Sequence, residues 1–140
     1  MKKIFVFFSI FLGSCTQTGY KFHNCSKPEL GELAIDISLE NMANIPEVVN
    51  RMNFSCKKEI TYPKAACYIV RNGTPNIGDR GLIVLLDEYI GECIIHELYH
   101  VELSVAYSDP CSSHKQGCYW DNTWLEPLLD QYREIKNETN

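Results

Sequence analysis

Residues 93–101 read CIIHELYHV and contain the pattern H-E-x-x-H at His96, Glu97 and His100. The residues around the pattern are mostly apolar, which predicts a buried helix. Two histidines four positions apart on a helix lie on one face, with Cβ atoms about 5–6 Å apart. Both imidazoles can therefore reach one Zn²⁺ ion, whose bonds to nitrogen are about 2.0–2.1 Å long.

Glu97 follows His96 and is rotated by about 100° around the helix axis, so it lies beside the metal and does not bind it. From there its carboxylate can take a proton from a zinc-bound water, which is the role of a general base. The alternative is a helix with two ordinary histidines and a solvated glutamate. The motif on an apolar helix favours a metal site over this alternative, and a hydrolytic enzyme over a bare metal site.

The first 14 residues have the features of a secretory signal peptide. Two lysines precede an apolar run at residues 4–12 that is too short to cross a bilayer, and small residues follow. Residues 12–15 read LGSC, which resembles the bacterial lipobox and implies cleavage before Cys15 and lipid on that cysteine. The alternative is an ordinary signal peptide, with Cys15 in a disulfide.

We therefore expect an exported protein that a lipid anchors to the membrane of the cell envelope. Thr16 follows Cys15 where lipoproteins of the enteric type carry an aspartate that retains them in the inner membrane, so the outer membrane or cell surface is favoured. Loss of the two lysines with the signal peptide changes the formal net charge from −5 to −7. This charge argues against nucleic acid as a partner.

The cysteine count fits an oxidising compartment. With one of the seven cysteines assigned to lipid, an even set remains that permits three disulfides: Cys25, Cys56, Cys67, Cys93, Cys111 and Cys118. Cys111 and Cys118 are the expected local pair. Cys93 lies close to the two histidines on the helix, so its thiol is either a further ligand or, as we prefer, half of a disulfide.

The segments before the motif predict strands and helices in one domain. Residues 15–29 begin with the lipidated cysteine and are polar after it, which predicts a tether between the lipid and the folded domain. Apolar residues alternate with polar ones over residues 32–40, which predicts a half-buried strand, while residues 41–52 are a candidate helix. Residues 66–70 and 82–86 predict two strands that pair as a hairpin.

The motif helix is expected to run from Glu88 to about Tyr107. Asp87 can cap its first turn, and Asp109-Pro110 would end it. Together with the strands, this helix predicts an α+β fold. A catalytic zinc usually has three protein ligands and one open position, so a third ligand is needed after His100. The downstream candidates are Asp109, His114, Asp121 and Glu126.

The H-E-x-x-H pattern resembles that of the zincin metallopeptidases. The metzincin branch does not fit, because Leu103 stands where its glycine belongs and Ala106 where its ligand belongs. The gluzincin branch has a glutamate on a later helix, followed four residues on by an aspartate, and Glu126 and Asp130 have this spacing. The resemblance, over residues 82–132, implies that Glu126 is the third ligand and that Asp130 orients His96.

The same resemblance implies a minimal zincin-like domain over residues 30–140, in which a small sheet lies beside the active-site helix and a C-terminal helix carries the third ligand. Pro127 would then occupy the first position of that helix, with Glu126 as its N-cap. His114 and, after it, Asp109 are the alternative third ligands. The oxyanion stabiliser would be Tyr107, His114 or Tyr119.

The implied function is a zinc metallopeptidase that acts on a peptide or protein substrate. A rival is a lipoprotein that binds zinc structurally or binds a protein partner without turnover, and a fourth ligand such as His114 or Cys93 would favour it. A second rival is a disulfide-rich interaction module that binds no metal.

Overall fold

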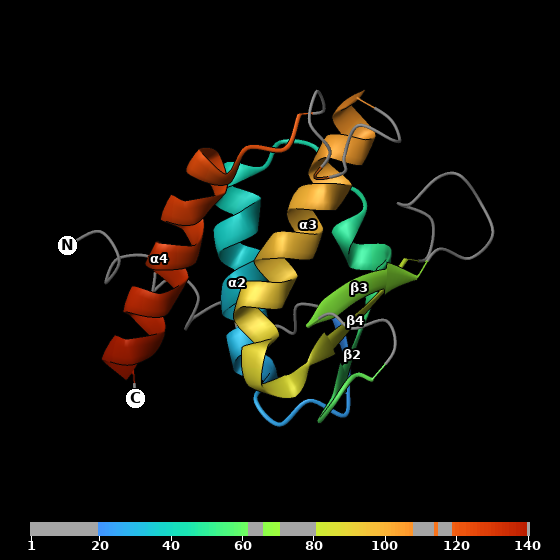
Figure 1. Cartoon of the computed structure of the whole chain (residues 1–140), viewed down its shortest axis with the longest axis vertical. Coiled ribbons are helices and arrows are strands. Elements are labelled where there is room, and N and C mark those ends of the chain that lie inside the picture. The colour runs from blue at the N-terminus through green and yellow to red at the C-terminus, as the bar shows by residue number, and fades with distance from the viewer. Residues whose placement is uncertain (1–19, 62–65, 71–80, 108–113, 115–118, 140) are drawn as a thin grey trace.

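The structure is a computed structural model that describes residues 20–61, 66–70, 81–107, 114 and 119–139. Within these residues, a four-stranded sheet lies beside three long helices (Figure 1), which confirms the predicted α+β class. The elements are β1 (Lys21–His23), α2 (Pro28–Asn41), β2 (Asn53–Lys57), β3 (Cys67–Val70), β4 (Leu82–Leu86), α3 (Ile90–Tyr107) and α4 (Asn122–Thr139), with short 3₁₀ helices at Val49–Arg51 and Asp87–Tyr89.

Several predicted features lie outside the described residues. They include the signal peptide, the lipid anchor at Cys15, the pair Cys111 and Cys118, and the candidate ligand Asp109. These features stay predictions. In the part of the chain that the structure describes, we find no helix with both the length and the apolar character needed to cross a bilayer.

The sheet has the strand order β1-β2-β4-β3. β1, β2 and β4 run parallel, whereas β3 at the edge is antiparallel to β4, with Tyr68 opposite Val84. The predicted hairpin of residues 66–70 and 82–86 is therefore confirmed. β4 is central and apolar, and its residues Ile83, Val84 and Leu85 are buried.

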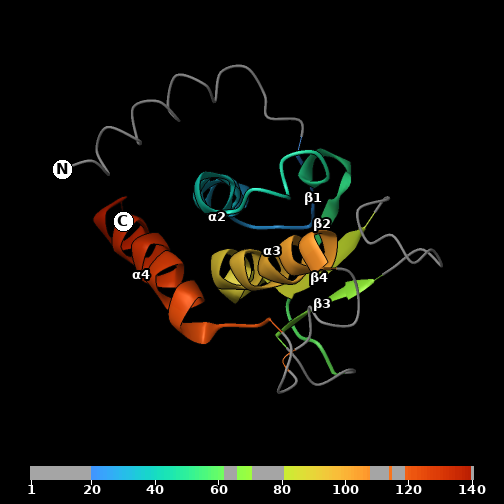
Figure 2. The same cartoon turned by 90° about the horizontal axis from the view of Figure 1, so that it is seen from above.

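Helix α3 is the centre of the molecule. It contacts β3 and β4 of the sheet and also packs against α2 and α4, which lie beside it (Figure 2). Ile94, Ile95, Leu98 and Val101 on α3 are fully buried, because the helix is covered on several sides. The helix predicted from Glu88 to about Tyr107 is thus confirmed to within two residues at its start.

The strand predicted at residues 32–40 is wrong, because this segment belongs to α2. Its buried positions include Gly31, Ala34, Ile35 and Ser38, which follow the three-and-four spacing of a helix face. Pro28 at the start of the helix suits its first turn. Residues 41–52, the candidate helix, contain instead the end of α2, turns and one 3₁₀ helix.

The tether predicted at residues 15–29 is wrong over its described part. Residues 21–23 form β1, which pairs with β2, and the ring of Phe22 stacks on Phe54 with centroids 5.2 Å apart. A disulfide joins Cys25 to Cys56. The folded domain therefore includes residues 20–29, before the predicted boundary at residue 30.

Contacts with Ser26 and with Tyr132 fix the start of α3. Before α3, the carboxylate of Asp87 accepts hydrogen bonds from the backbone N–H, at 2.9 Å, and from the hydroxyl of Ser26. These bonds lower the pKa of Asp87. On the other side, the ring of Tyr132 from α4 lies so close to Gly91 that a Cβ there would be 1.9 Å from the Tyr132 Cζ. Glycine thus allows α4 to approach α3 closely.

Candidate metal centre

The rings of three histidines lie close together beside the middle of α3. His96 and His100 lie one turn apart on the helix, and His114 approaches them from the segment between α3 and α4. Each offers one ring nitrogen, and these nitrogens lie within 4.8 Å of one another, with His100 Nε2 and His114 Nε2 2.9 Å apart. A tetrahedral zinc with bonds of about 2.0–2.1 Å separates its ligand nitrogens by about 3.3 Å, so the cluster is compact enough for its three side chains to hold one ion.

The environment of His96 favours its metal-binding form. Burial, and after it the electrostatic effect of His100 and His114, lowers the pKa of His96 to about 4. The imidazole is therefore neutral at pH 7, and the neutral ring is the form that binds metal. A donor set of three histidine nitrogens suits Zn²⁺ in general, and these three described residues form a cluster that could hold a metal ion.

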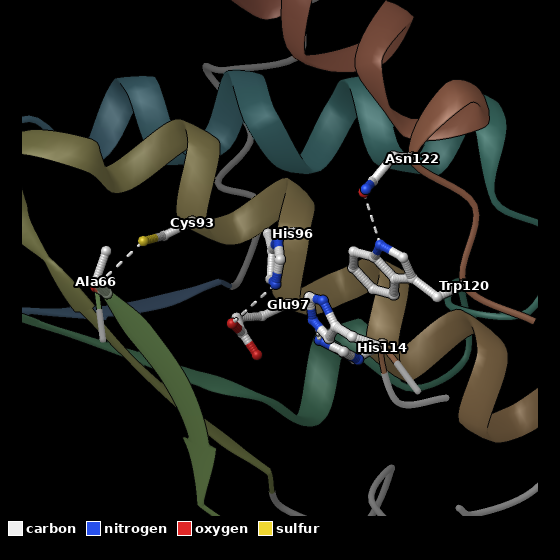
Figure 3. Close-up of polar contacts among 8 residues, drawn as sticks. Ala66, Cys93, His96, Glu97, His114, Trp120 and Asn122 are labelled. Atoms are coloured by element: carbon white, nitrogen blue, oxygen red, sulfur yellow. Dashed lines mark hydrogen bonds and ion pairs between the residues drawn. The ribbon is translucent and has the colours of Figure 1, made fainter. Parts of the chain in front are cut away.

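Trp120 forms an aromatic wall over the three histidines. Its ring centroid lies 4.2 Å from that of His114, 4.4 Å from that of His100 and 4.8 Å from that of His96. Its indole N–H donates a hydrogen bond of 2.7 Å to Asn122 Oδ1, which fixes the ring (Figure 3). Trp120 therefore restricts the orientations of the histidines, and the sequence analysis missed it because no spacing pattern marks it.

Glu97 lies beside the cluster and outside it. Its side chain is buried, and its Oε2 lies 3.9 Å from His96 Nε2 (Figure 3). Burial raises the pKa of Glu97 to about 7, and a hydrogen bond with the thiol of Cys67 acts in the opposite direction. The carboxyl group can thus gain or lose a proton near neutral pH, as a general base must.

Two thiols, those of Cys67 and Cys93, lie near Glu97. The thiol of Cys93 donates to the carbonyl oxygen of Ala66 at 3.2 Å (Figure 3), and neither Cys93 nor Cys67 is in a disulfide. The pKa of Cys67 is raised, first by its hydrogen bond with Cys93 and then by burial. Cys93 does not join the histidine cluster, so neither prediction for it, ligand or half of a disulfide, matches the structure.

The structure does not bring Glu126 to the histidines. Glu126 is exposed, because α4 turns its apolar face, with Leu125 and Leu129, toward the core. The predicted N-cap at Glu126 is also wrong, since α4 begins at Asn122 and Pro127 lies inside it. The cluster contains the alternative ligand, His114, in its place.

Asp121 and Asp130 have other roles. Asp121 precedes α4, and its Oδ1 accepts a hydrogen bond of 3.0 Å from the N–H of Thr123, as an N-cap does. Asp130 is exposed on α4 and lies 3.6 Å from Arg133, so it does not orient His96 as predicted. Of the oxyanion candidates, Tyr119 is exposed, and His114 is part of the cluster.

A cavity of about 450 Å³ adjoins the site, and His96 and Glu97 line it together with residues of β3, α3 and α4. A substrate group in this cavity would therefore contact the candidate base directly. Comparison of the chain with protein-family models, with curated proteins and with solved structures finds no match. The geometry itself defines the class: a protein with a three-histidine cluster able to bind a metal ion.

Proposed function

We propose that the protein is a zinc-dependent metallopeptidase. The observation that carries the proposal is the buried carboxyl group of Glu97 beside a cluster of three histidines that borders a cavity. In the described part of the chain, the cluster has three ligand side chains, which leaves one tetrahedral position for water or substrate. A structural zinc site usually fills all four positions with protein ligands.

His96, His100 and His114 would hold the ion. Zinc, when bound, would polarise the scissile carbonyl and favour loss of a proton from the attacking water. Glu97 would accept that proton, because its pKa of about 7 matches neutral conditions, and would pass it to the leaving amine. Trp120 would keep the histidine rings in place during these steps.

The sheet also suits a peptide substrate. β3 lies at the edge of the described sheet and pairs with β4 alone there. Its residue Cys67 and the preceding Ala66 line the cavity beside His96 and Glu97. An extended peptide can add to such an edge through backbone hydrogen bonds, which would place its scissile bond near the proposed base.

The metal assignment is tested by the zinc content of the purified protein and two variants. We expect one zinc per chain in the wild type, loss of zinc in His114→Ala, and retention in Glu126→Ala. Glu126 is the matched control because it lies on the exposed face of α4. Zinc lost with Glu126→Ala and kept with His114→Ala would refute the three-histidine site, and no zinc in the wild type would favour an interaction module.

The catalytic assignment is tested by peptide cleavage with Glu97→Gln. The amide cannot accept the proton, so the rate should fall by about 10²–10⁴-fold while the zinc content is unchanged. An equal rate in the wild type and the variant would contradict the role of Glu97. A wild-type protein that binds zinc and cleaves no member of a peptide library would instead be a non-catalytic zinc-binding or protein-interaction lipoprotein.

A further inference from the structure

The cavity beside the histidine cluster has a charged end. Glu92, Cys93, His96 and Glu97 line it from α3, where residues three or four positions apart lie one above the other, as Glu92 and His96 do and as Cys93 and Glu97 do. Glu92 lies one helical turn before His96, a rise of about 6 Å along the axis. Arg133 of α4 lies across from Glu92, with its Nε 3.6 Å from Glu92 Oε2.

The carboxylate of Glu92 is incompletely paired. Its Oε1 is buried and has no hydrogen-bond partner among the residues that the structure describes. Its separation from Arg133 is longer than a hydrogen bond. A buried acceptor without a donor is unfavourable, and because Glu92 lines the cavity, a small rotation of its side chain would let the carboxylate accept a bond from a donor there.

The local charge favours a cation as that donor. Arg133 lies 3.6 Å from Asp130 as well as from Glu92, so one guanidinium is shared by two carboxylates. The group therefore has an excess of one negative charge, and a positively charged group in the cavity would neutralise it. An acidic group would be repelled by Glu92, and the Arg133 guanidinium that could attract it is already shared by two carboxylates.

The other walls of the cavity are mainly apolar, and they include Tyr89, Cys93 and Leu129. A ligand that matches both features has an aliphatic stem for these walls and a cationic end for Glu92. Lysine and arginine side chains have this form, with a stem that packs on apolar surface and a charged head that reaches a polar partner. A free amino terminus lacks the stem, and an apolar side chain would bring no donor for Glu92 Oε1.

We propose that the cavity binds a lysine or arginine side chain of the substrate next to the scissile bond, with the Glu92 carboxylate as its partner. The substrate assignment rests on the proposed peptidase function, since His96 and Glu97 line the same cavity. Glu92 is then the residue that determines specificity. The peptidase would cleave beside basic residues.

The first test measures binding without turnover. The zinc-free protein is titrated with N-acetyl-lysine amide, N-acetyl-norleucine amide and N-acetyl-glutamate amide, followed by NMR. We expect the lysine amide to bind at least about tenfold more tightly than the norleucine amide, because its ammonium forms a charge-assisted bond with Glu92. Equal affinities would overturn the inference, and this comparison uses only the wild-type chain.

The second test uses Glu92→Gln, with Glu126→Gln as a matched control on an exposed carboxylate. The preference for the lysine amide should disappear in Glu92→Gln and persist in Glu126→Gln. A preference that survives Glu92→Gln would overturn the assignment to this residue. If the Gln variant does not fold, Glu92→Asp keeps the charge with a shorter stem, and the preference should then weaken without disappearing.

The third test compares cleavage of peptides that differ at one position, occupied by lysine, arginine, norleucine or glutamate. Faster cleavage beside the basic residues, lost in Glu92→Gln, is the expected result. Cleavage with no preference would overturn the inference and leave the peptidase function intact. Selective binding of the lysine amide without cleavage of any peptide would contradict the peptidase function and support the cation site alone.

Discussion

Replacement of Glu97 by glutamine should change how the stability of the zinc-free protein depends on pH. Burial raises the pKa of Glu97 from its ordinary value of 4.5 to about 7. Between these two values, the folded protein holds a proton that the unfolded chain has released. The free energy of unfolding therefore falls as the pH rises through this range, and the loss is complete above pH 7.

The size of the effect follows from the shift. A pKa difference of one corresponds to 1.36 kcal/mol, so the rise at Glu97 amounts to about 3 kcal/mol of lost stability at pH 8. Glutamine has nearly the same shape and does not ionise, so Glu97→Gln lacks this loss. Asp36, whose pKa is raised to about 6 by burial and by Glu32 and Glu40, acts in the same direction but is present in both proteins and cancels.

The assay is urea unfolding in the presence of a chelator, from pH 5 to pH 8. We expect Glu97→Gln to gain about 3 kcal/mol over the wild type across this range, and most of the gain should appear between pH 5 and pH 7. Glu126→Gln controls for the loss of one negative charge at an exposed site. If the free energy of unfolding depended on pH in the same way in Glu97→Gln and the wild type, the claim that burial raises the pKa of Glu97 would be refuted.

Two further predictions concern the frame that holds α3. Gly91→Ala should destabilise the protein by about 1–3 kcal/mol in thermal or urea unfolding, because the new Cβ overlaps the Tyr132 ring, and Tyr132→Leu in the same chain should recover part of the loss. Joint replacement of Cys25 and Cys56 by serine should cost about 3–4 kcal/mol, because their disulfide closes a loop across 31 residues. A reductant should lower the stability of the wild type more than that of the double variant, and an equal response of both would contradict this assignment.

The elements that the sequence predicted correctly have simple local patterns. α3 combines a continuous apolar stretch with the H-E-x-x-H motif, and β3 and β4 are short apolar strands bounded by turn residues. α2 was predicted as a strand for a physical reason. It is packed on several sides, so partly buried residues such as Leu33 and Leu39 add to the apolar count and imitate an alternation of period two. The start signal at Pro28 was the better indication.

Only the part of the candidate site that lies on a single helix could be predicted from the sequence. His96, Glu97 and His100 have a fixed relation once the helix is known, whereas His114 reaches them from a segment without periodicity. The spacing of Glu126 and Asp130 was misleading, because two carboxylates four residues apart also occur on the exposed face of an amphipathic helix. Trp120 could not be assigned, since its role depends on ring contacts between segments distant from the motif.

The burial of Glu97 bears on function as well as stability. A structural metal site with three histidines gains nothing from a buried carboxyl group 3.9 Å from one ligand, and the group lowers stability at neutral pH. Such a cost persists where a residue is needed for chemistry. The proposed role therefore predicts three properties of one variant. Glu97→Gln should be more stable than the wild type at pH 8, should still bind zinc, and should cleave peptides far more slowly. A structural role for Glu97 would predict the opposite for stability, because the substitution would then weaken the fold.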